Sequence, residues 1–433
     1  MTRTADAVVI GAGVIGAAIS LELARSGRSV VVVDKAGGVG HGSTSASSAI
    51  VRFHYSTRTA VALAWESRHC WADWRGHLGH DDPDGMAEFV RTGMLVLERD
   101  PAGSAGTTAH FDDVGVPWER WSADDVRRRA PALDIGAYGP PKPVASDEFF
   151  DEPHGELGGT WTPDAGYVDD ASLAAHNLAT AARAHGATYL LRREVIALDP
   201  GGQRRWRVRV RHGAASDTVD CDVVVNAAGP WSGAVNALAH ADEDFAVTSR
   251  PLRQEVHRLP VPSGASLELE LGDADLGVYL RPTPGGVLVG GMEPECDPLE
   301  WLDRPEDADP HVTTATYEAQ TLRAARRVPG LTVPNRPTGI VGVYDASTDW
   351  TPIYDRTALA GYYVAMGTSG NQFKNAPVVG QLMAGLIAAV EGGHDHDRDP
   401  LVWTAPRTGQ HLELATYSRL RRVDPDAPTS VMG

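Results

Sequence analysis

The chain contains few cysteines, few lysines and no long apolar run. Among its 433 residues there are only three cysteines, which are Cys70, Cys221 and Cys296. An odd number at this wide spacing argues against a disulfide framework, a redox pair and a cysteine-rich zinc site, and we expect no metal. No apolar run reaches the roughly 18 residues needed to cross a bilayer. The first apolar strand begins at Ala7, which leaves no room for a signal peptide, so we expect a cytoplasmic protein with no membrane partner.

Positive charge is also scarce. The chain has 39 Lys and Arg residues against 57 Asp and Glu residues, a formal net charge of −18. This balance repels phosphate backbones and argues against nucleic acid as a partner, although it permits a local basic site for a small anion. A hydrophobic content of 42% is ordinary for a globular protein. The length is sufficient for two domains.

The most informative pattern lies between residues 7 and 34. An apolar strand over 7–10 precedes a G-x-G-x-x-G turn, an Ala-rich helix, a second apolar strand over 29–33 and a carboxylate. The glycines permit a tight turn, close approach of a pyrophosphate and close helix packing, and the carboxylate accepts ribose hydroxyls. The pattern predicts dinucleotide binding by Gly11, Gly13, Val14, Ile15, Gly16, Asp34 and Lys35. A βαβ unit without ligand is the alternative.

Two further segments are candidates for cofactor contacts. The loop over 42–48 offers the hydroxyls of Ser43, Thr44, Ser45, Ser47 and Ser48 to a pyrophosphate or ribityl chain, although such loops are often solvated linkers. An apolar strand over 222–225 ends in small residues, as expected for a central strand with a ligand at its carboxyl end. We assign Ala228, Gly229 and Trp231 to the cofactor there, and Val195 in the strand over 194–198. No second G-x-G-x-x-G occurs, so an FAD would have to be reduced by the substrate itself.

Two rare cationic positions suggest an anion-binding site. Arg52 is flanked by apolar residues and is suited to clamp a carboxylate, although a surface arginine is the commoner case. Lys374 is one of three lysines and lies in a loop that leads into a helix with a proline near its start. A helix N-terminus there would favour the negative charge of a reduced flavin. The loop residues assigned to the cofactor are Gly370, Asn371, Gln372, Phe373 and Lys374.

Two motifs resemble those of a known family. These are Ile50-Val-Arg-Phe-His-Tyr55 and Ser369-Gly-Asn-Gln-Phe-Lys374 followed by Ala376-Pro377. The chain resembles the FAD-dependent amine oxidoreductases that include D-amino acid oxidase, glycine oxidase and sarcosine oxidase, and looks closest to the sarcosine oxidase branch. The resemblance implies that Arg52 and Lys374 hold a substrate carboxylate over the flavin. It also implies that Tyr279 and Tyr344 line the substrate cavity and that the segment 226–231 contacts FAD.

Three departures from the family pattern matter. Gly342 stands where the monomeric sarcosine oxidases tether FAD to a cysteine, so we expect non-covalent FAD. Leu288 or a neighbour stands where that branch has a lysine that promotes reaction with oxygen, which leaves a dehydrogenase with another electron acceptor open. Asn371-Gln372 replaces the usual Gly-His, which leaves the substrate open.

These observations predict an α/β protein with an α+β second domain. The Rossmann-like FAD domain is expected to comprise 1–79, 160–245 and 336–400, and an antiparallel-sheet substrate domain 80–159 and 246–335, with a tail over 401–433. Helices are expected over 60–74, 170–185, 313–327 and 376–390, irregular structure over 79–143 with a short strand over 93–98, and a solvated linker over 394–399.

The predicted reaction oxidises the C–N bond of an amino acid or N-alkyl amino acid to an imine, with hydride transfer to flavin N5. The partners are then a small amine that carries a carboxylate, and oxygen or another electron acceptor. The alternatives are an NAD-dependent dehydrogenase and a non-catalytic flavin-binding protein.

Overall fold

The structure is a computed structural model that describes residues 2–261, 267–423 and 430–432. Three separate parts of the chain form a six-stranded sheet, in the order β10-β3-β2-β14-β22-β21. All neighbours are parallel except β21 and β22, which are antiparallel. The strands are β2 (Ala7–Ile10), β3 (Val30–Asp34), β10 (Thr188–Leu191), β14 (Val223–Asn226), β21 (Ile353–Arg356) and β22 (Tyr362–Met366).

Both faces of this sheet are buried, which explains its valine-rich strands. Successive residues of β2 belong alternately to two hydrophobic clusters: Ala7 and Val9 to one, Val8 and Ile10 to the other. The first cluster includes helices α1 (Val14–Arg25), α6 (Ala171–Ala184) and α9 (Ala376–Glu391). The second includes a four-stranded sheet and α7 (Ser232–Ala239). That sheet consists of β1 (Thr2–Thr4), β13 (Ala215–Cys221), β12 (Trp206–His212) and β11 (Glu194–Pro200).

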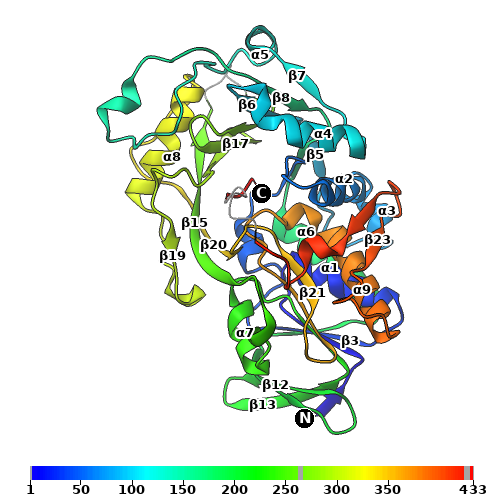
Figure 1. Cartoon of the computed structure of the whole chain (residues 1–433). Helices are drawn as coiled ribbons and strands as arrows, with labels where there is room; N and C mark the ends of the chain where they lie inside the picture. The colour runs from blue at the N-terminus through cyan, green and yellow to red at the C-terminus, as the bar shows by residue number, and fades with distance from the viewer. Residues whose placement is uncertain (1, 262–266, 424–429, 433) are drawn as a thin grey trace.

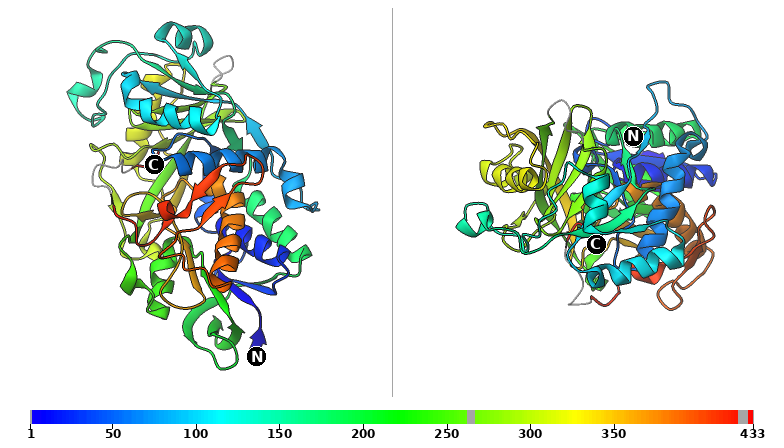
Figure 2. Two further views of the ribbon diagram at one scale, coloured as in Figure 1. Left: turned by 45° about the vertical axis from the view of Figure 1, so that its right-hand side comes forward. Right: turned by 90° about the horizontal axis from the view of Figure 1, so that it is seen from above.

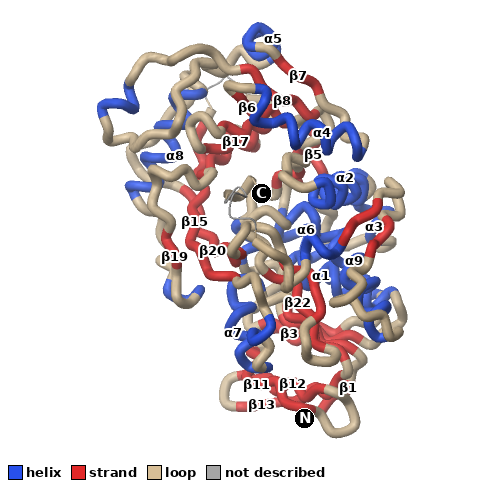
Figure 3. The backbone as a smooth tube through the Cα atoms, viewed as in Figure 1, coloured by secondary structure: helices blue, strands red, loops and turns tan. Residues whose placement is uncertain are grey.

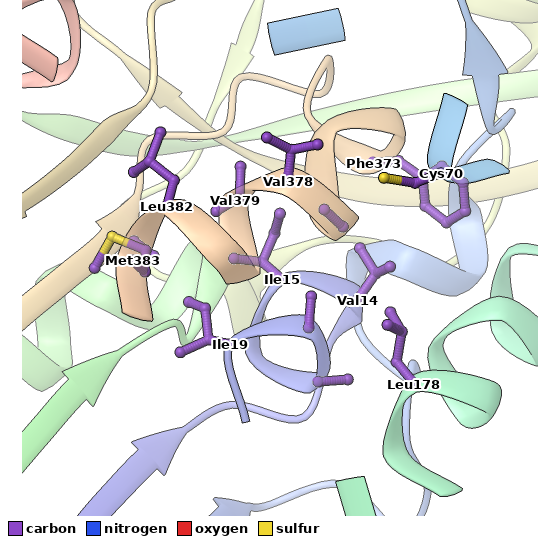
Figure 4. Packing of buried hydrophobic residues seen from close by; sticks show 14 of the residues in the cluster. Val14, Ile15, Ile19, Cys70, Leu178, Phe373, Val378, Val379, Leu382 and Met383 are labelled. Carbon is purple, nitrogen blue, oxygen red and sulfur yellow. The ribbon is translucent and has the colours of Figure 1, made fainter. Parts of the chain in front are cut away.

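Helix α1 lies between α6 and α9 (Figures 2 and 4). Its side chains Ile15 and Ile19 face Val379 and Met383 of α9. The backbones approach closely because α9 has a glycine here: a Cβ on Gly380 would lie 2.6 Å from the carbonyl oxygen of Ala18. Helix α1, which follows the glycine turn, is therefore packed tightly against α9, which follows Lys374.

The helical stretch Phe373–Glu391 has 19 residues and is apolar enough, by length and composition, to cross a membrane. This corrects the expectation that no such stretch exists, because the interruptions by Lys374 and Asn375 hide it from a search for an unbroken run. Its most apolar window is 67% buried within the protein, largely against α1. Packing in the core therefore accounts for its apolar composition.

A nine-stranded sheet forms the second large group of strands (Figures 1 and 3). Its order is β19-β15-β18-β17-β16-β6-β8-β7, with β20 on β15, and all pairs are antiparallel except β16 with β6. Helix α8 (Thr314–Arg327) packs against it. The strands are β6 (Met94–Glu98), β7 (Glu119–Trp121), β8 (Gly158–Thr162), β15 (Ser249–Pro260), β16 (Glu270–Asp273), β17 (Val278–Thr283), β18 (Gly286–Gly291), β19 (Glu300–Trp301) and β20 (Gly339–Ser347).

The predicted fold class is confirmed. The division into domain ranges stays a prediction, and two strands do not fit it. Strand β20 pairs along its whole length with β15, on the side of the large sheet, although the range 336–400 was assigned to the cofactor domain. Strand β8 extends across the predicted boundary at 160. The sheet to which each strand belongs is set by its hydrogen-bonded partners, and the sequence of a strand says little about which distant strand it will pair with.

The region 79–143 is more regular than expected. The strand expected over 93–98 is confirmed as β6, but α4 (Ala105–Val114), α5 (Ala123–Arg129) and β7 were missed. A capping box begins α5, in which Ser122 and Asp125 satisfy each other's backbone N–H. The remaining elements are α2 (Arg58–Ala72), α3 (Trp74–Leu78), a small sheet of β4 (Ile50–Val51), β9 (Gly166–Val168) and β5 (Phe89–Arg91), and a hairpin of β23 (Val402–Thr404) and β24 (His411–Glu413).

The segment 394–399 is not a solvated linker throughout. His396 is buried, and its Nδ1 accepts a hydrogen bond from the N–H of Leu401. Asp397 pairs with the guanidinium of Arg419, which is also buried and pairs with Asp355 as well. The buried arginine fixes the segment after β24 to the edge of the six-stranded sheet.

Candidate active site

A cavity of about 920 Å³ lies at the carboxyl ends of the six-stranded sheet. The ends of β2, β3 and β14 line one side, and residues of β15, β17 and β20 line the other. The loop before α9 and the segment 43–50 complete the wall. A cavity at the carboxyl ends of parallel strands is the usual place for a nucleotide cofactor.

The glycine turn brings the chain close to the neighbouring strand. Gly11 has φ +107°, and a Cβ there would lie 2.3 Å from the carbonyl oxygen of Ala227. Gly13 is the N-cap of α1 and has no side chain to cover the helix end. Gly16 does not line the cavity, contrary to its assignment as a cofactor contact. A Cβ on it would lie 2.0 Å from the oxygen of Gly11, so its role is to let α1 approach the turn.

Asp34 and Thr44 fix the backbone around this turn. The two carboxylate oxygens of Asp34 accept hydrogen bonds from the N–H groups of Ala12, at 2.6 Å, and Ala36, at 2.7 Å. The hydroxyl of Thr44 accepts from the N–H of Val14 at 3.1 Å. The cavity wall therefore presents a helix N-terminus beside a carboxylate, which suits a pyrophosphate and a ribose.

Most other predicted cofactor residues also line the cavity. They are Val14, Ile15, Lys35, Ser43, Thr44, Ser47, Ser48, Val195, Ala228, Gly229, Trp231, Gly370, Asn371, Gln372, Phe373 and Lys374. Ser45 does not: it is exposed, and its hydroxyl donates to the carbonyl of Gly42. Ser43 donates to the carbonyl of Val343, which ties the serine loop to β20.

Lys35 lies at the rim with an acidic partner that the sequence did not indicate. Its ammonium group is 2.6 Å from the carboxylate of Glu306 and 3.9 Å from the ring centroid of Trp231. Trp231 donates its indole N–H to the same carboxylate. Glu306 lies 271 residues after Lys35, and no local pattern links the two.

Arg52 is buried beside the cavity. Its guanidinium donates to the carbonyl of His54 and to the carbonyls of Val431, at 2.5 Å, and Met432, at 3.1 Å. It forms no ion pair with any residue that the structure describes. Burial lowers the pKa of Arg52, and the neighbouring Tyr55 and Glu270 oppose that shift.

Lys374 is also close to the Tyr55 ring. Both cationic groups are 4.9 Å from the centroid of that ring. The ammonium of Lys374 donates to the carbonyl of Asn371 at 2.7 Å and, within the described ranges, has no carboxylate partner. Burial and the charge of Arg52 hold its pKa well below the usual range. The structure therefore brings Arg52 and Lys374 together beside the cavity, and their role in holding a carboxylate stays a prediction.

Glu270 is a buried acid close to these cations. Both of its carboxylate oxygens lack a hydrogen-bond partner among the described residues, and burial raises its pKa well above the usual range. The charges of Arg281, Lys374 and Arg52 oppose that shift. Because burial favours the neutral form of Glu270, this acid does not neutralise Arg52, and an anionic ligand bound here would favour the charged form of Lys374.

The predicted tyrosines both line the cavity, and each needs a glycine opposite its ring. A Cβ on Gly290 would lie 2.3 Å from the Tyr279 ring, and one on Gly370 2.2 Å from the Tyr344 ring. The hydroxyl of Tyr279 lies 2.9 Å from that of Ser48, and burial raises the pKa of Tyr279 to about 12. Both side chains therefore remain neutral phenols.

His54 has the structural role that a histidine in an apolar segment usually has. Its ring packs edge-on against Phe111 and does not line the cavity. Burial lowers its pKa to about 3, so the ring is neutral at physiological pH. Neither Leu288 nor any of the three cysteines, all within the described residues, lines the cavity.

Two groups of the site escaped the sequence analysis. The last described residues, Val431 and Met432, line the cavity although the tail was assigned no function. Glu293 accepts hydrogen bonds from the N–H of Val431 at 2.8 Å and from the side chain of Gln254 at 3.1 Å. These residues lie in unrelated parts of the chain, and no motif connects them.

The sheet order and the cavity are those of the dinucleotide-binding class of proteins, with the cofactor site at the switch point of the sheet. Residues 6–386 match the model of the DAO family, described as FAD dependent oxidoreductase. The chain belongs to this family, so its cofactor is FAD, and the alternative of an NAD-dependent dehydrogenase is removed.

The sequence identity to individual relatives is low, but several of the matches extend over most of the chain. The chain is 24% identical over 431 residues to FAD-dependent oxidoreductase domain-containing protein 1 of Xenopus laevis, with 90% of this chain and 80% of that protein covered. It spans only 38% of the protein of that name from Bos taurus. It is 26% identical to glycine oxidase of Bacillus licheniformis, covering 89% of this chain and 94% of that one. A solved structure, L-proline dehydrogenase from P. horikoshii, has a TM-score of 0.75 at 21% identity and covers 97% and 98%.

The cavity suits FAD. The N-terminus of α1, Asp34 and the Ser43–Ser48 segment would hold its adenosine and pyrophosphate end. The loop before α9 would lie at its flavin end, where the start of a helix favours the negative charge of the reduced ring.

Proposed function

We propose that the protein oxidises the C–N bond of an amino acid or N-alkyl amino acid. The main support is the pair Arg52 and Lys374, two buried cations that border the cavity and form no ion pair with described residues. Buried charges in proteins are normally paired, so this pair calls for an anionic ligand. Relatives named glycine oxidase and L-proline dehydrogenase are consistent with an amino acid as that ligand.

Each side chain has a distinct part in this reaction. FAD supplies the acceptor of the two electrons that leave the substrate. Arg52 offers two N–H groups in one plane, the geometry that holds a carboxylate in a fixed orientation, and Lys374 adds a second positive charge. Tyr279 and Tyr344 form apolar walls that exclude water from the imine. Holding the carboxylate places the C–N bond at a fixed position, which contributes to catalysis by orientation.

We infer that the FAD is not covalently attached, since Gly342 lies on the cavity wall at the position of the tethering cysteine of the monomeric sarcosine oxidases. An electron acceptor other than oxygen is the second candidate, because Lys35 and Lys374 are the only described lysines on the wall. Acid precipitation tests the attachment: free flavin should remain in the supernatant. Comparing turnover in air with and without an artificial acceptor tests the second point, and rapid peroxide formation in air would contradict it.

The experiment for the main proposal uses the purified yellow protein. It is mixed anaerobically with a panel of glycine, N-methylglycine, L-proline and other amino acids, and flavin absorbance near about 450 nm is followed. Bleaching by at least one amino acid is expected, and the corresponding amine without a carboxylate should leave the flavin oxidised. If no member of a broad panel bleaches the flavin, the proposal is wrong and a non-catalytic flavin-binding role remains.

A further inference from the structure

The last described residues of the chain occupy the substrate side of the cavity. In Figure 1 the C-terminal end of the chain lies in the middle of the molecule. The Val431 side chain is buried in a cluster with Leu252, Ala346 and Trp350, and Tyr344 packs against that cluster. A segment that packs against a substrate-cavity tyrosine competes for space with any substrate.

The contacts of the Val431 backbone have the pattern that an amino acid would need. Its N–H donates to a carboxylate oxygen of Glu293 at 2.8 Å, and its carbonyl oxygen accepts from Arg52 at 2.5 Å. The nitrogen and the carbonyl carbon of a residue are attached to the same Cα, as are the amino and carboxyl groups of an α-amino acid. Val431 thus joins an acidic and a basic side chain across the distance that one α-amino acid spans.

We propose that Glu293 binds the amino group of the substrate while Arg52 binds its carboxylate, and that Val431 occupies this two-ended site as an internal mimic until substrate displaces it. The inference rests on the proposed function. It adds a residue that selects for an amine and a reason for the position of the tail.

The carboxyl group of Glu293 is fixed in position by hydrogen bonds to both of its oxygens. Its residue is partly exposed, but its carboxyl group is enclosed, with one oxygen bound to Gln254 and the other to Val431. Its backbone has φ +50°, a left-handed conformation that a glutamate adopts at some cost and that is common at functional sites. Of the groups that face it, Arg52 is cationic, and Tyr279 and Tyr344 are neutral phenols.

Burial raises the pKa of Glu293 to about 8, although the Val431 N–H and Arg52 oppose that shift. In its ionised form, the Glu293 carboxylate is basic enough to accept a proton from a substrate ammonium group. In that step an N–H bond of the ammonium breaks and an O–H bond forms on Glu293, and no electrons are transferred. The substrate is left as the neutral amine that the oxidation requires.

The test uses the whole FAD-loaded protein and a form that ends at Thr429 and so lacks the mimic. Two matched pairs of probes are glycine with acetate, and L-proline with cyclopentanecarboxylate. Within each pair the second compound keeps the carboxylate and lacks the nitrogen. Binding is measured anaerobically from the perturbation of flavin absorbance before any reduction, and FAD content and melting temperature show that each variant folds.

Removal of residues 430–433 should strengthen the binding of both acetate and glycine by about tenfold or more, because Arg52 is freed. In the shortened protein, Glu293→Gln should reduce the preference for the amino acid over its matched acid by about tenfold or more and leave acetate binding within about threefold. Glu295→Gln, an exposed acid in the same segment, should change neither. Glu293→Asp keeps the charge and should retain part of the preference, which covers the case that Glu293→Gln does not fold.

Two results would overturn this inference. Unchanged affinities in the shortened protein would show that the tail does not compete with substrate. An equal loss for both members of each pair on Glu293→Gln would show a structural role for Glu293. If instead no amino acid perturbs or reduces the flavin in any variant, the proposed function fails first. Reduction by amino acids with an unchanged preference ratio contradicts only the inference.

Discussion

Replacement of Arg52 by methionine separates the binding of a carboxylate from the binding of FAD. Methionine keeps an unbranched chain that fills most of the same space, and it removes the guanidinium that donates to Val431 and Met432. Arg52 lies at the substrate side, while the adenosine end of the cofactor lies at α1 and Asp34. FAD content should therefore remain close to that of the wild type.

The magnitude follows from the burial of the guanidinium. Loss of one partner from a buried, hydrogen-bonded charge pair costs about 2 to 5 kcal/mol. Lys374 remains close to the same Tyr55 ring as Arg52 and can still attract the ligand, so a value of about 3 kcal/mol is appropriate, equivalent to roughly 150-fold weaker binding of a carboxylate.

Anaerobic reduction at several substrate concentrations gives the apparent dissociation constant and the limiting rate separately. The dissociation constant should rise roughly 150-fold for every amino acid that reduces the flavin. Arg58→Met is the matched control, because Arg58 is partly exposed, pairs with Asp113 and lies outside the cavity. Equal affinities for the wild type and Arg52→Met, or an equal loss in Arg58→Met, would refute the role of Arg52.

Three further predictions concern substitutions at single positions. Gly11→Ala should lower the FAD content about tenfold or more, because its Cβ would meet the Ala227 carbonyl. Gly27→Ala is the control, since Gly27 also has positive φ but open space around it, and an equal loss there would contradict the reasoning. Gly370→Ala should leave FAD bound and raise KM, because its Cβ would meet the Tyr344 ring; an unchanged KM would mean that this ring does not line the substrate site. The pKa of Glu293 is raised to about 8, so the stability that its proton contributes is present below the pKa of the unfolded chain and is lost as pH rises through about 8. The melting temperature of Glu293→Gln should therefore rise relative to the wild type between about pH 5 and pH 8, and a constant difference would contradict the raised pKa.

The cofactor half of the site could be predicted because its information is local. The turn from Gly11 to Gly16, the strand that ends at Asp34 and the loop before α9 each combine backbone geometry and chemistry within a few residues. Arg52 and Lys374 were candidates from their sequence setting, and the resemblance to a family added their shared role and the two cavity tyrosines; the structure places all four on the cavity wall.

The remaining part depends on contacts between distant segments. Glu293 and Val431 are 138 residues apart, and Arg52 and Val431 are 379 residues apart. Neither pair leaves a periodic or compositional signal. Helix α4 was missed for another reason: its glycine and two threonines have low helix propensity, and tertiary packing of Phe111 and Val114 overrides it. Gly16 and Ser45 were assigned to the cofactor because they belong to a motif, although neither residue lines the cavity.

The pairing of β14 has a consequence for how the protein is made. This strand bonds to β2 on one side and to β22 on the other, and β22 ends only at Met366. While the ribosome is still adding residues 227 to 361, β14 has an unpaired apolar edge, which is the kind of edge that attracts other chains. The loop before α9 is made later still. We therefore expect FAD to be acquired after synthesis is nearly complete, and fragments that end before residue 362 to require a chaperone to remain unaggregated.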